Sequence, residues 1–329
     1  MLETFEGLIF DVKGFLHPPD RVIAYLRYYP NTRGSRQRAG VRYRRVYNLD
    51  ERTKLLKKRW PLYLYNSTVL HRQVQAVPNR RIKRQYLPVK MIAELQERRD
   101  LDQLERFASD MAETLAREST IPLSKIGLSG SILVGLHTSQ SDIDLIIYGA
   151  QWAHACYQRL TTLMSTRSSG FSPLGSTELH NLYFQRVPGM NVSFARFQKH
   201  ERSKVLQGKF KDRQYFLRCV KEWSEITEKY SDKEFFPLGR MRVTAKIIDD
   251  SDSILTPCKY LLSNIKIINS EHEEIPSEIV SFRGRYCEQV HNGDRIVAEG
   301  LLERVDDASS STHRLLVGEN AMDQLVRVD

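Results

Sequence analysis

Acidic residues are scarce in the first quarter of this 329-residue chain. Residues 1–90 hold 20 lysines and arginines against 6 aspartates and glutamates, a net charge of +14, whereas the remainder of the chain carries −4. A basic excess confined to one segment is typical of a surface that binds a polyanion such as a nucleic acid. A solubilising basic face would produce the same charge, so both interpretations stay open on charge alone.

Long apolar runs and closely spaced cysteines are also missing. No stretch of about 18 apolar residues occurs, so no membrane span or membrane partner is expected. The first residues, MLETFEGLIF, lack the basic start and small-residue cleavage site of a secretory signal. The cysteines are four in number and far apart, with no CxxC, which argues against a zinc site or a disulfide framework. A reducing, cytoplasmic setting is therefore expected.

Length and hydrophobic patterning predict an α+β chain of three domains. Residues 1–90 read as a basic β-rich domain that can bind nucleic acid, and residues 91–236 alternate helical and strand patterns around one short mixed sheet. Residues 237–329 contain five strand-like runs separated by polar turns, including Asn292-Gly293. Five short strands fit a small closed barrel of the OB type, and the alternative is part of a β sandwich.

The basic first region interleaves cations with aromatic residues. GLIFDVKGFLH and RVIAYLRYYP predict two strands joined by a proline-rich turn, and VRYRRVYNL predicts a third. Basic grooves with aromatic platforms suit single-stranded RNA or DNA. The alternative is a small β domain whose aromatic residues belong to its core. The candidate contacts to phosphate or nucleic acid here are Arg42, Arg44, Arg45, Lys57, Lys58, Arg80, Arg81, Lys83 and Arg84.

The middle region begins with a helical pattern over residues 91–115. KIGLSG then predicts a short strand, SILVGLH a short helix, SDIDLIIYG a strand and QWAHACYQRLTTLM a helix. LYFQRV and MNVSFARF, joined by Pro-Gly, predict a β-hairpin, and DRQYFLRCVKEWSEIT predicts a closing helix.

Two aspartates lie one residue apart on the predicted strand SDIDLIIYG. Asp142 and Asp144 would project from one face of it, and two carboxylates this close repel each other unless cations lie between them. A pair of divalent ions is a common solution, and Mg²⁺ is the usual ion near phosphates. Upstream, Gly130-Ser131 lies where a strand turns into a helix, a place where a backbone can approach phosphate closely. Together these features predict a nucleoside triphosphate held at its phosphates.

Gly130-Ser131, ten intervening residues and then Asp142-Ile143-Asp144-Leu145 resemble the signature of the DNA polymerase β-like nucleotidyltransferase superfamily. The whole chain is also similar to predicted archaeal nucleotidyltransferases with no settled substrate. The resemblance makes residues 91–236 the nucleotidyltransferase core. It implies transfer of a nucleoside monophosphate from an NTP, such as ATP, to an acceptor with release of pyrophosphate. It also implies that Asp142 and Asp144 hold Mg²⁺ or Mn²⁺ and that Gly130, Ser131 and Ser141 bind the nucleotide.

Many members of this superfamily carry a third carboxylate on a neighbouring strand, close to the acceptor hydroxyl. The expected strand here, residues 190–197, offers Asn191 and Ser193 instead, and neither is a base at neutral pH. Glu178 and His180, just upstream, are the candidate substitutes. If neither serves, the activity would be slowed, altered in its acceptor, or absent. Lys199 and Arg202 would either neutralise the leaving pyrophosphate or belong to a solvated basic loop.

Three functional hypotheses follow. The first is a Mg²⁺-dependent nucleotidyltransferase whose acceptor is RNA or DNA. The second keeps this chemistry but moves the acceptor to a protein side chain or a small molecule. The third is a nucleic-acid-binding or regulatory protein built on a catalytically degenerate nucleotidyltransferase fold.

Overall fold

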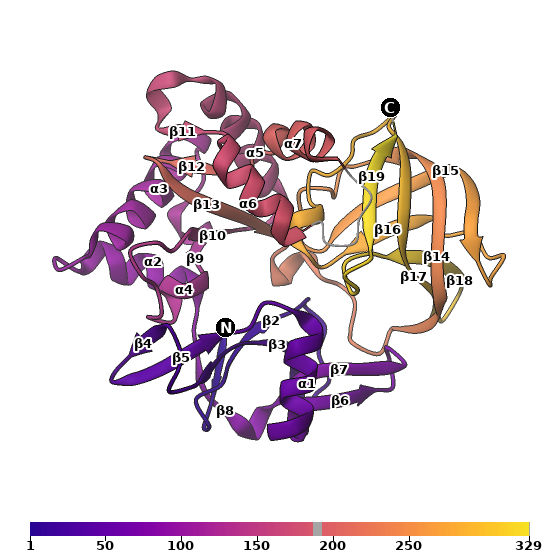
Figure 1. The fold of residues 1–329 in the computed structure, drawn as a ribbon, viewed down its shortest axis with the longest axis horizontal. Helices are drawn as coiled ribbons and strands as arrows, with labels where there is room; N and C mark the ends of the chain where they lie inside the picture. The colour runs from indigo at the N-terminus through magenta and orange to yellow at the C-terminus, as the bar shows by residue number, and fades with distance from the viewer. Residues whose placement is uncertain (187–192, 329) are drawn as a thin grey trace.

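The computed structural model describes residues 1–186 and 193–328. The chain forms three bodies, with the N-terminal sheet on one side of the middle region and the C-terminal strands on another (Figure 1). The mixed α+β class predicted from sequence is confirmed. Among the described residues, no helix is both long enough and apolar enough to cross a membrane.

The N-terminal region is a sheet with a single α-helix, α1 (Leu49–Arg59), which is capped by Asn48. The predicted strands around the proline-rich turn are β2 and β3, which pair antiparallel. The basic run RTKLLKKRW forms most of α1. The strands of this region are β1 (Leu2–Thr4), β2 (Ile9–Val12), β3 (Arg21–Pro30), β4 (Arg36–Arg38), β5 (Val41–Arg45), β6 (Leu64–Ser67), β7 (Arg72–Pro78) and β8 (Ile82–Gln85).

The two faces of this sheet pack against different partners. Phe10, Leu26 and Tyr29 lie on one face, in an apolar cluster with Leu56 of α1. Ile9, Tyr28 and Tyr43 lie on the other face, in a cluster with Leu133, Val134 and Leu136 of the middle region. We call this second face the inner face. In Figure 1 the inner face meets the middle region where β4 and β5 lie beside α4 (Gly130–Leu133).

The middle region is built on a five-stranded sheet in the order β11-β12-β13-β10-β9. Its strands are β9 (Ile126–Leu128), β10 (Ile143–Tyr148), β11 (Phe171–Ser172), β12 (Gln207–Phe210) and β13 (Arg213–Val220). The helices besides α4 are α2 (Pro88–Glu97), α3 (Gln103–Ser119), α5 (Ala150–Ser165), α6 (Ser176–Arg186) and α7 (Phe194–Ser203). Strand β10 is parallel to β13 and antiparallel to β9. Apolar residues of α3 and α5 join Ile143, Leu145 and Ile147 of β10 in one core.

Three predictions for the middle region need correction. The helical pattern over residues 91–115 forms two helices, α2 and α3, because Asp102 and Glu105 make a capping box that starts a new helix. The predicted hairpin is wrong where the structure describes it. Its two halves lie in α6 and α7, with Ser193 capping α7 through a hydrogen bond from the Arg196 N–H. Asn191 lies outside the described residues.

The predicted closing helix, DRQYFLRCVKEWSEIT, is also wrong, because its first half is strand β13. Tyr215, Leu217 and Cys219 are buried at alternate positions, which is the period of a strand. Burial against two neighbouring strands outweighs the helical propensity of the segment. As a strand, β13 pairs directly with the aspartate strand β10.

Each of the five strand-like runs predicted beyond residue 237 contains a strand, although in EIVSFRGRYC only the first four residues are extended and a 3-10 turn follows. These strands are β14 (Lys233–Asp249), β15 (Cys258–Ser270), β16 (Glu278–Ser281), β17 (Arg295–Asp307) and β18 (Ser311–Leu316), and a further strand, β19 (Gln324–Val328), pairs with β17. The pairings run β14-β15-β16-β18-β17 and return to β14. Only β16 and β18 are parallel among these pairs.

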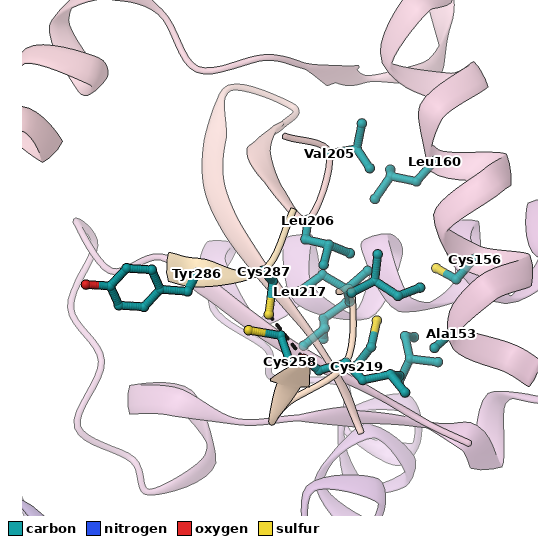
Figure 2. Close-up of a cluster of buried hydrophobic side chains, with 14 of the residues drawn as sticks. Ala153, Cys156, Leu160, Val205, Leu206, Leu217, Cys219, Cys258, Tyr286 and Cys287 are labelled. Carbon is teal, nitrogen blue, oxygen red and sulfur yellow. Dashed lines mark hydrogen bonds between the residues drawn. The ribbon is translucent and has the colours of Figure 1, made fainter. Parts of the chain in front are cut away.

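One apolar core joins the middle region to the C-terminal strands. Figure 2 shows Cys156 and Leu160 of α5, Leu217 and Cys219 of β13, and Cys258 and Cys287 of the C-terminal region around the same volume. All four cysteines are buried and free. The backbone continues the contact, because the N–H of Thr256 donates to the carbonyl of Cys219 at 2.7 Å.

Candidate active site

Asp142 lies directly before β10 and Asp144 lies on it. Because side chains alternate along a strand, the burial of Ile143, Leu145 and Ile147 against α3 and α5 leaves Asp144 on the opposite side of the sheet. That side faces the N-terminal sheet, whose Arg27 and Arg45 act on the Asp144 carboxylate. The predicted aspartate pair therefore lies between two regions of the chain that are distant in sequence.

Gly130 and Asp144 are packed directly together. Gly130 has φ +62°, a conformation that side-chain-bearing residues rarely adopt. A Cβ atom at this position would overlap the carboxylate of Asp144. The backbone N–H of Ser129 also donates to the Asp144 carbonyl at 2.7 Å. The structure thus joins the two halves of the sequence motif into one site, and only glycine fits at its centre.

The two carboxylates are not neutralised by any described residue. Neither side chain forms an ion pair or accepts a hydrogen bond within residues 1–186 and 193–328. Burial and the adjacent Asp142 raise the pKa of Asp144 to about 7, although Arg27, Arg45 and Arg218 act in the opposite direction. A carboxylate pair in this condition favours a bound cation, which would lower the free energy of the ionised form.

Two serines of the motif have different roles. Ser131 is buried, and its Oγ has no hydrogen-bond partner in the described part of the chain. Ser141, in contrast, accepts hydrogen bonds from Arg36 Nη1 at 2.7 Å and from the Thr138 N–H at 3.0 Å. Ser141 therefore holds the loop that precedes Asp142, whereas the buried hydroxyl of Ser131 has no partner in the described part of the chain.

The N-terminal strand β4 clamps this loop. Arg36 Nη1 also donates to the carbonyl of Leu136 at 3.0 Å, and Arg38 Nη1 donates to that of Val134 at 3.0 Å. Arg38 is held in turn by Glu3 at 2.7 Å. Sequence reasoning did not identify these two arginines, because their partners in the middle region are about 100 residues away in the chain.

No third carboxylate lies on the strands that flank β10. Neither β9 nor β13 contains Asp or Glu, and Phe216 is opposite Asp144 in the register of β13. Of the substitutes predicted from sequence, Ser193 caps α7, Glu178 lies 3.8 Å from Lys209 Nζ, and His180 stacks on Phe194. Within the described residues, no group of three or more His, Cys, Asp or Glu side chains is placed to hold a metal ion.

The residues that are present still fit a magnesium ion. Asp142 and Asp144 supply only oxygen ligands, and both are half-buried and uncompensated. Mg²⁺ is commonly held by one or two protein carboxylates and completes its octahedral shell with water and phosphate oxygens. Two carboxylates are therefore sufficient when a nucleotide supplies the remaining oxygens.

The predicted basic contacts divide into two groups. Arg45 turns toward Asp144, whereas most of the others are exposed away from it. Arg81 is partly buried and lies 3.5 Å from Glu6. The exposed residues are Arg42 and Arg44 on β5, Lys57 and Lys58 on α1, Arg80, Lys83 and Arg84 near β8, and Lys199 and Arg202 on α7. Arg27 and Arg218, which act on Asp144, were missed because nothing in their local sequence distinguishes them from other strand arginines.

Comparison with known proteins agrees with this geometry. Residues 109–227 match the family model described as a nucleotidyltransferase domain. An uncharacterized protein of Methanocaldococcus jannaschii is 28% identical over 325 residues, which cover 96% of this chain and 93% of that protein. No solved structure matches the chain. The resemblance read from the Gly-Ser and Asp-x-Asp motifs is thus confirmed, and the matched residues lie within the middle region of this chain.

Proposed function

We propose that this protein is a Mg²⁺-dependent nucleotidyltransferase that moves a nucleoside monophosphate from an NTP to an RNA or DNA acceptor and releases pyrophosphate. The observation that carries the proposal is the pair Asp142 and Asp144, which is uncompensated by any described residue and packed against Gly130. A protein without a cation ligand has little physical reason to keep two adjacent carboxylates in a half-buried site.

The chain's own residues have distinct tasks in this reaction. Asp142 and Asp144 hold the metal, which when bound polarises the α-phosphate and lowers the pKa of the attacking hydroxyl. Gly130 lets the backbone approach the phosphates, and Ser131 Oγ donates a hydrogen bond to a phosphate oxygen. Arg36 and Ser141 keep the preceding loop in place.

A nucleic-acid acceptor is supported by the basic outer surface of the N-terminal region. Arg42, Arg44, Lys57 and Lys58 are exposed there, and Arg44 forms a solvent-exposed pair with Glu51 at 3.3 Å. Exposed cations of this kind bind phosphates at little cost, since surface ion pairs contribute little to stability.

We further propose a division into residues 1–90, 91–236 and 237–329, with the last forming an OB-type barrel that also contacts the polynucleotide. The closed series of pairings from β14 back to β14, with a parallel pair between β16 and β18, supports this architecture.

The absence of a carboxylate on β9 and β13 favours one alternative, a catalytically degenerate protein that binds or regulates nucleic acid.

A single experiment separates the hypotheses. The protein is incubated with each α-labelled NTP, Mg²⁺ or Mn²⁺, and separate pools of RNA, DNA, protein and small-molecule acceptors.

We expect label transfer to RNA or DNA. Asp142→Asn should abolish it, because this change removes a metal ligand. The matched control is Asp110→Asn, since Asp110 is exposed on α3 and pairs with Lys211 at 2.7 Å. Label transfer to the protein or small-molecule pool would support the same chemistry with an acceptor that is not a nucleic acid. No transfer under any condition, with salt-sensitive RNA or DNA binding intact, would establish the degenerate alternative.

A further inference from the structure

The inner face of the N-terminal sheet delivers two arginines to the Asp142 and Asp144 site. On β5, Arg45 is opposite Tyr28 of β3. Directly paired residues of antiparallel strands share a face, and Tyr28 packs on Leu133 and Val134 of the middle region. Arg45 therefore projects toward the nucleotidyltransferase domain, while its neighbour Arg44, opposite Tyr29, projects toward α1.

Arg27 reaches the same place through a β-bulge. Ile9 and Phe10 of β2 are opposite Tyr28 and Leu26, so Arg27 is an extra residue in β3 without a partner in β2. Bulges redirect a side chain and are common beside active sites. The Arg27 guanidinium interacts electrostatically with both Asp144 and Asp11.

The two guanidinium groups are held on an aromatic ring and not on carboxylates. Arg45 Cζ lies 4.2 Å and Arg27 Cζ 5.7 Å from the centre of the Tyr47 ring. Neither guanidinium hydrogen-bonds a carboxylate within the described residues, and the buried Nε of Arg45 has no partner among them. A guanidinium stacked on a ring keeps its in-plane N–H groups free for the oxygens of an anion.

The third guanidinium near Asp144 is contributed by the nucleotidyltransferase domain itself. Arg218 on β13 lies 3.9 Å from Asp11, and its buried Nε is likewise without a partner in the described chain. Asp11 is already compensated, because Lys13 Nζ lies 2.6 Å from it. Buried donors without partners each cost about 1–3 kcal/mol. The two such donors near the carboxylate pair, Arg45 Nε and Arg218 Nε, together with the Arg27 guanidinium, fit a site that receives an oxygen-rich anion.

We propose that Arg27 and Arg45 bind the phosphate tail of the nucleotide, so that the N-terminal sheet is a wall of the nucleotide site. This inference rests on the proposed function and makes it more specific, because it assigns the cations that hold the triphosphate and the released pyrophosphate. It also narrows the role expected of Arg45, predicted from sequence as a contact to phosphate or nucleic acid, to that of a nucleotide-phosphate ligand.

The test uses inorganic tripolyphosphate, ATP and AMP as probes in equilibrium binding to the full-length protein. We expect tripolyphosphate and ATP to bind more tightly than AMP. Arg27→Gln and Arg45→Gln should each weaken tripolyphosphate and ATP on the order of tenfold or more, the loss typical of a charged hydrogen bond, while AMP changes little. Arg45→Lys should recover only part of the affinity, because an ammonium lacks the planar fork.

The control is Arg33→Gln, which removes the same charge from an exposed position of the N-terminal region. Thermal unfolding of each variant verifies that it is folded. Equal tripolyphosphate affinity in the wild type and both inner-face variants, or no tripolyphosphate binding by the wild type, would overturn the inference. Arginine-dependent tripolyphosphate binding without nucleotidyl transfer in the labelling assay would support the anion site and contradict the proposed transferase activity.

Discussion

The contact between the middle region and the C-terminal strands is largely apolar, with buried Glu288 and Lys204 paired, whereas the contact between the middle region and the N-terminal sheet adds to its apolar cluster a set of charged groups, some of which lack hydrogen-bond partners. In the first, Glu288 accepts hydrogen bonds from the N–H groups of Val205 and Leu206 at 2.8 and 2.9 Å, and Lys204 Nζ donates to the carbonyl of Arg285 at 2.7 Å. In the second, Asp144, Arg45 Nε, Arg218 Nε and Ser131 Oγ have no hydrogen-bond partner among the described residues.

The difference between paired and unpaired buried polar groups distinguishes a structural contact from a ligand-binding one. A permanent contact gains stability by pairing its buried polar groups, as Glu288 and Lys204 are paired in the contact with the C-terminal strands. A ligand site must keep donors and acceptors free until the ligand arrives, and the folded protein is less stable for it. The uncompensated groups of the N-terminal contact therefore support the proposal that substrate binds there.

The largest expected effect comes from breaking the charged contact at its centre. Gly130→Ala would place a methyl group on the Asp144 carboxylate and strain a residue at φ +62°. We expect nucleotidyl transfer to fall by at least about 100-fold, because displacement of a reacting group by about 1 Å has that cost. Steady-state kinetics with labelled NTP measure the loss.

The control for this variant is Gly40→Ala, at φ +77° with no atom within 4 Å of the added Cβ. It imposes similar backbone strain without the collision, at a cost on the order of 1–3 kcal/mol of stability. If both variants lost activity equally, backbone strain and not contact with Asp144 would explain the result.

Breaking the contact between the middle region and the C-terminal strands should lower the stability of the folded protein. Glu288→Ala removes the acceptor for two buried N–H groups, and we expect the free energy of unfolding to fall by about 2–5 kcal/mol. Denaturant unfolding measures this change, and Glu273→Ala, an exposed residue of the same region, should change it little. A normal stability for Glu288→Ala would mean that this contact is no more permanent than the charged one.

The charged contact should also give stability a characteristic pH dependence. The pKa of Asp144 is raised from 3.8 to about 7, so between these values the folded state binds more protons than the unfolded state. The contribution of Asp144 to the free energy of unfolding therefore falls as pH rises from about 4 to 7.

Replacing the acid removes this dependence. Asp144→Asn should be more stable than the wild type at pH 8, by on the order of a few kcal/mol, and nearly equal to it at pH 4. Adding Mg²⁺ should stabilise the wild type more at pH 8 than at pH 5 and leave the variant unchanged. Denaturant titrations across pH test both points. Parallel stability curves for the two proteins would contradict an uncompensated Asp144.

The motif of this site was accessible from sequence because it is local. Gly130, Ser131, Asp142 and Asp144 lie within fifteen residues, and the expected strand, short helix and strand around them are β9, α4 and β10. The strands beyond residue 237 followed from their alternating patterns and polar turns. Short-range periodicity and turn chemistry are sufficient for features of this kind.

The surroundings of the motif were not accessible, because they depend on pairing between distant segments. Strand β13 was read as a helix, and only its burial between β10 and β12 makes it a strand. Arg27 has no sequence signal at all, since its orientation comes from a register shift between β2 and β3. The side of β5 that faces the site depends in the same way on its pairing with β3, which sequence alone does not specify.

The smallest expected effect distinguishes the two faces of β5. Arg44 is exposed toward solvent, so Arg44→Gln should weaken binding of single-stranded RNA or DNA only a few-fold, uniformly across sequences. The slope of log affinity against log salt should become shallower by about 0.7, the value for the loss of one phosphate contact on a single strand. Arg45→Gln, one residue away, should leave that slope unchanged while weakening tripolyphosphate binding, since Arg45 faces Asp144. Salt titrations with a labelled oligonucleotide measure both slopes.

Because the two variants remove the same charge from the same strand, any difference between them comes from the direction of the side chain. Equal slopes for Arg44→Gln and Arg45→Gln would mean that the inner and outer faces serve one continuous nucleic-acid surface.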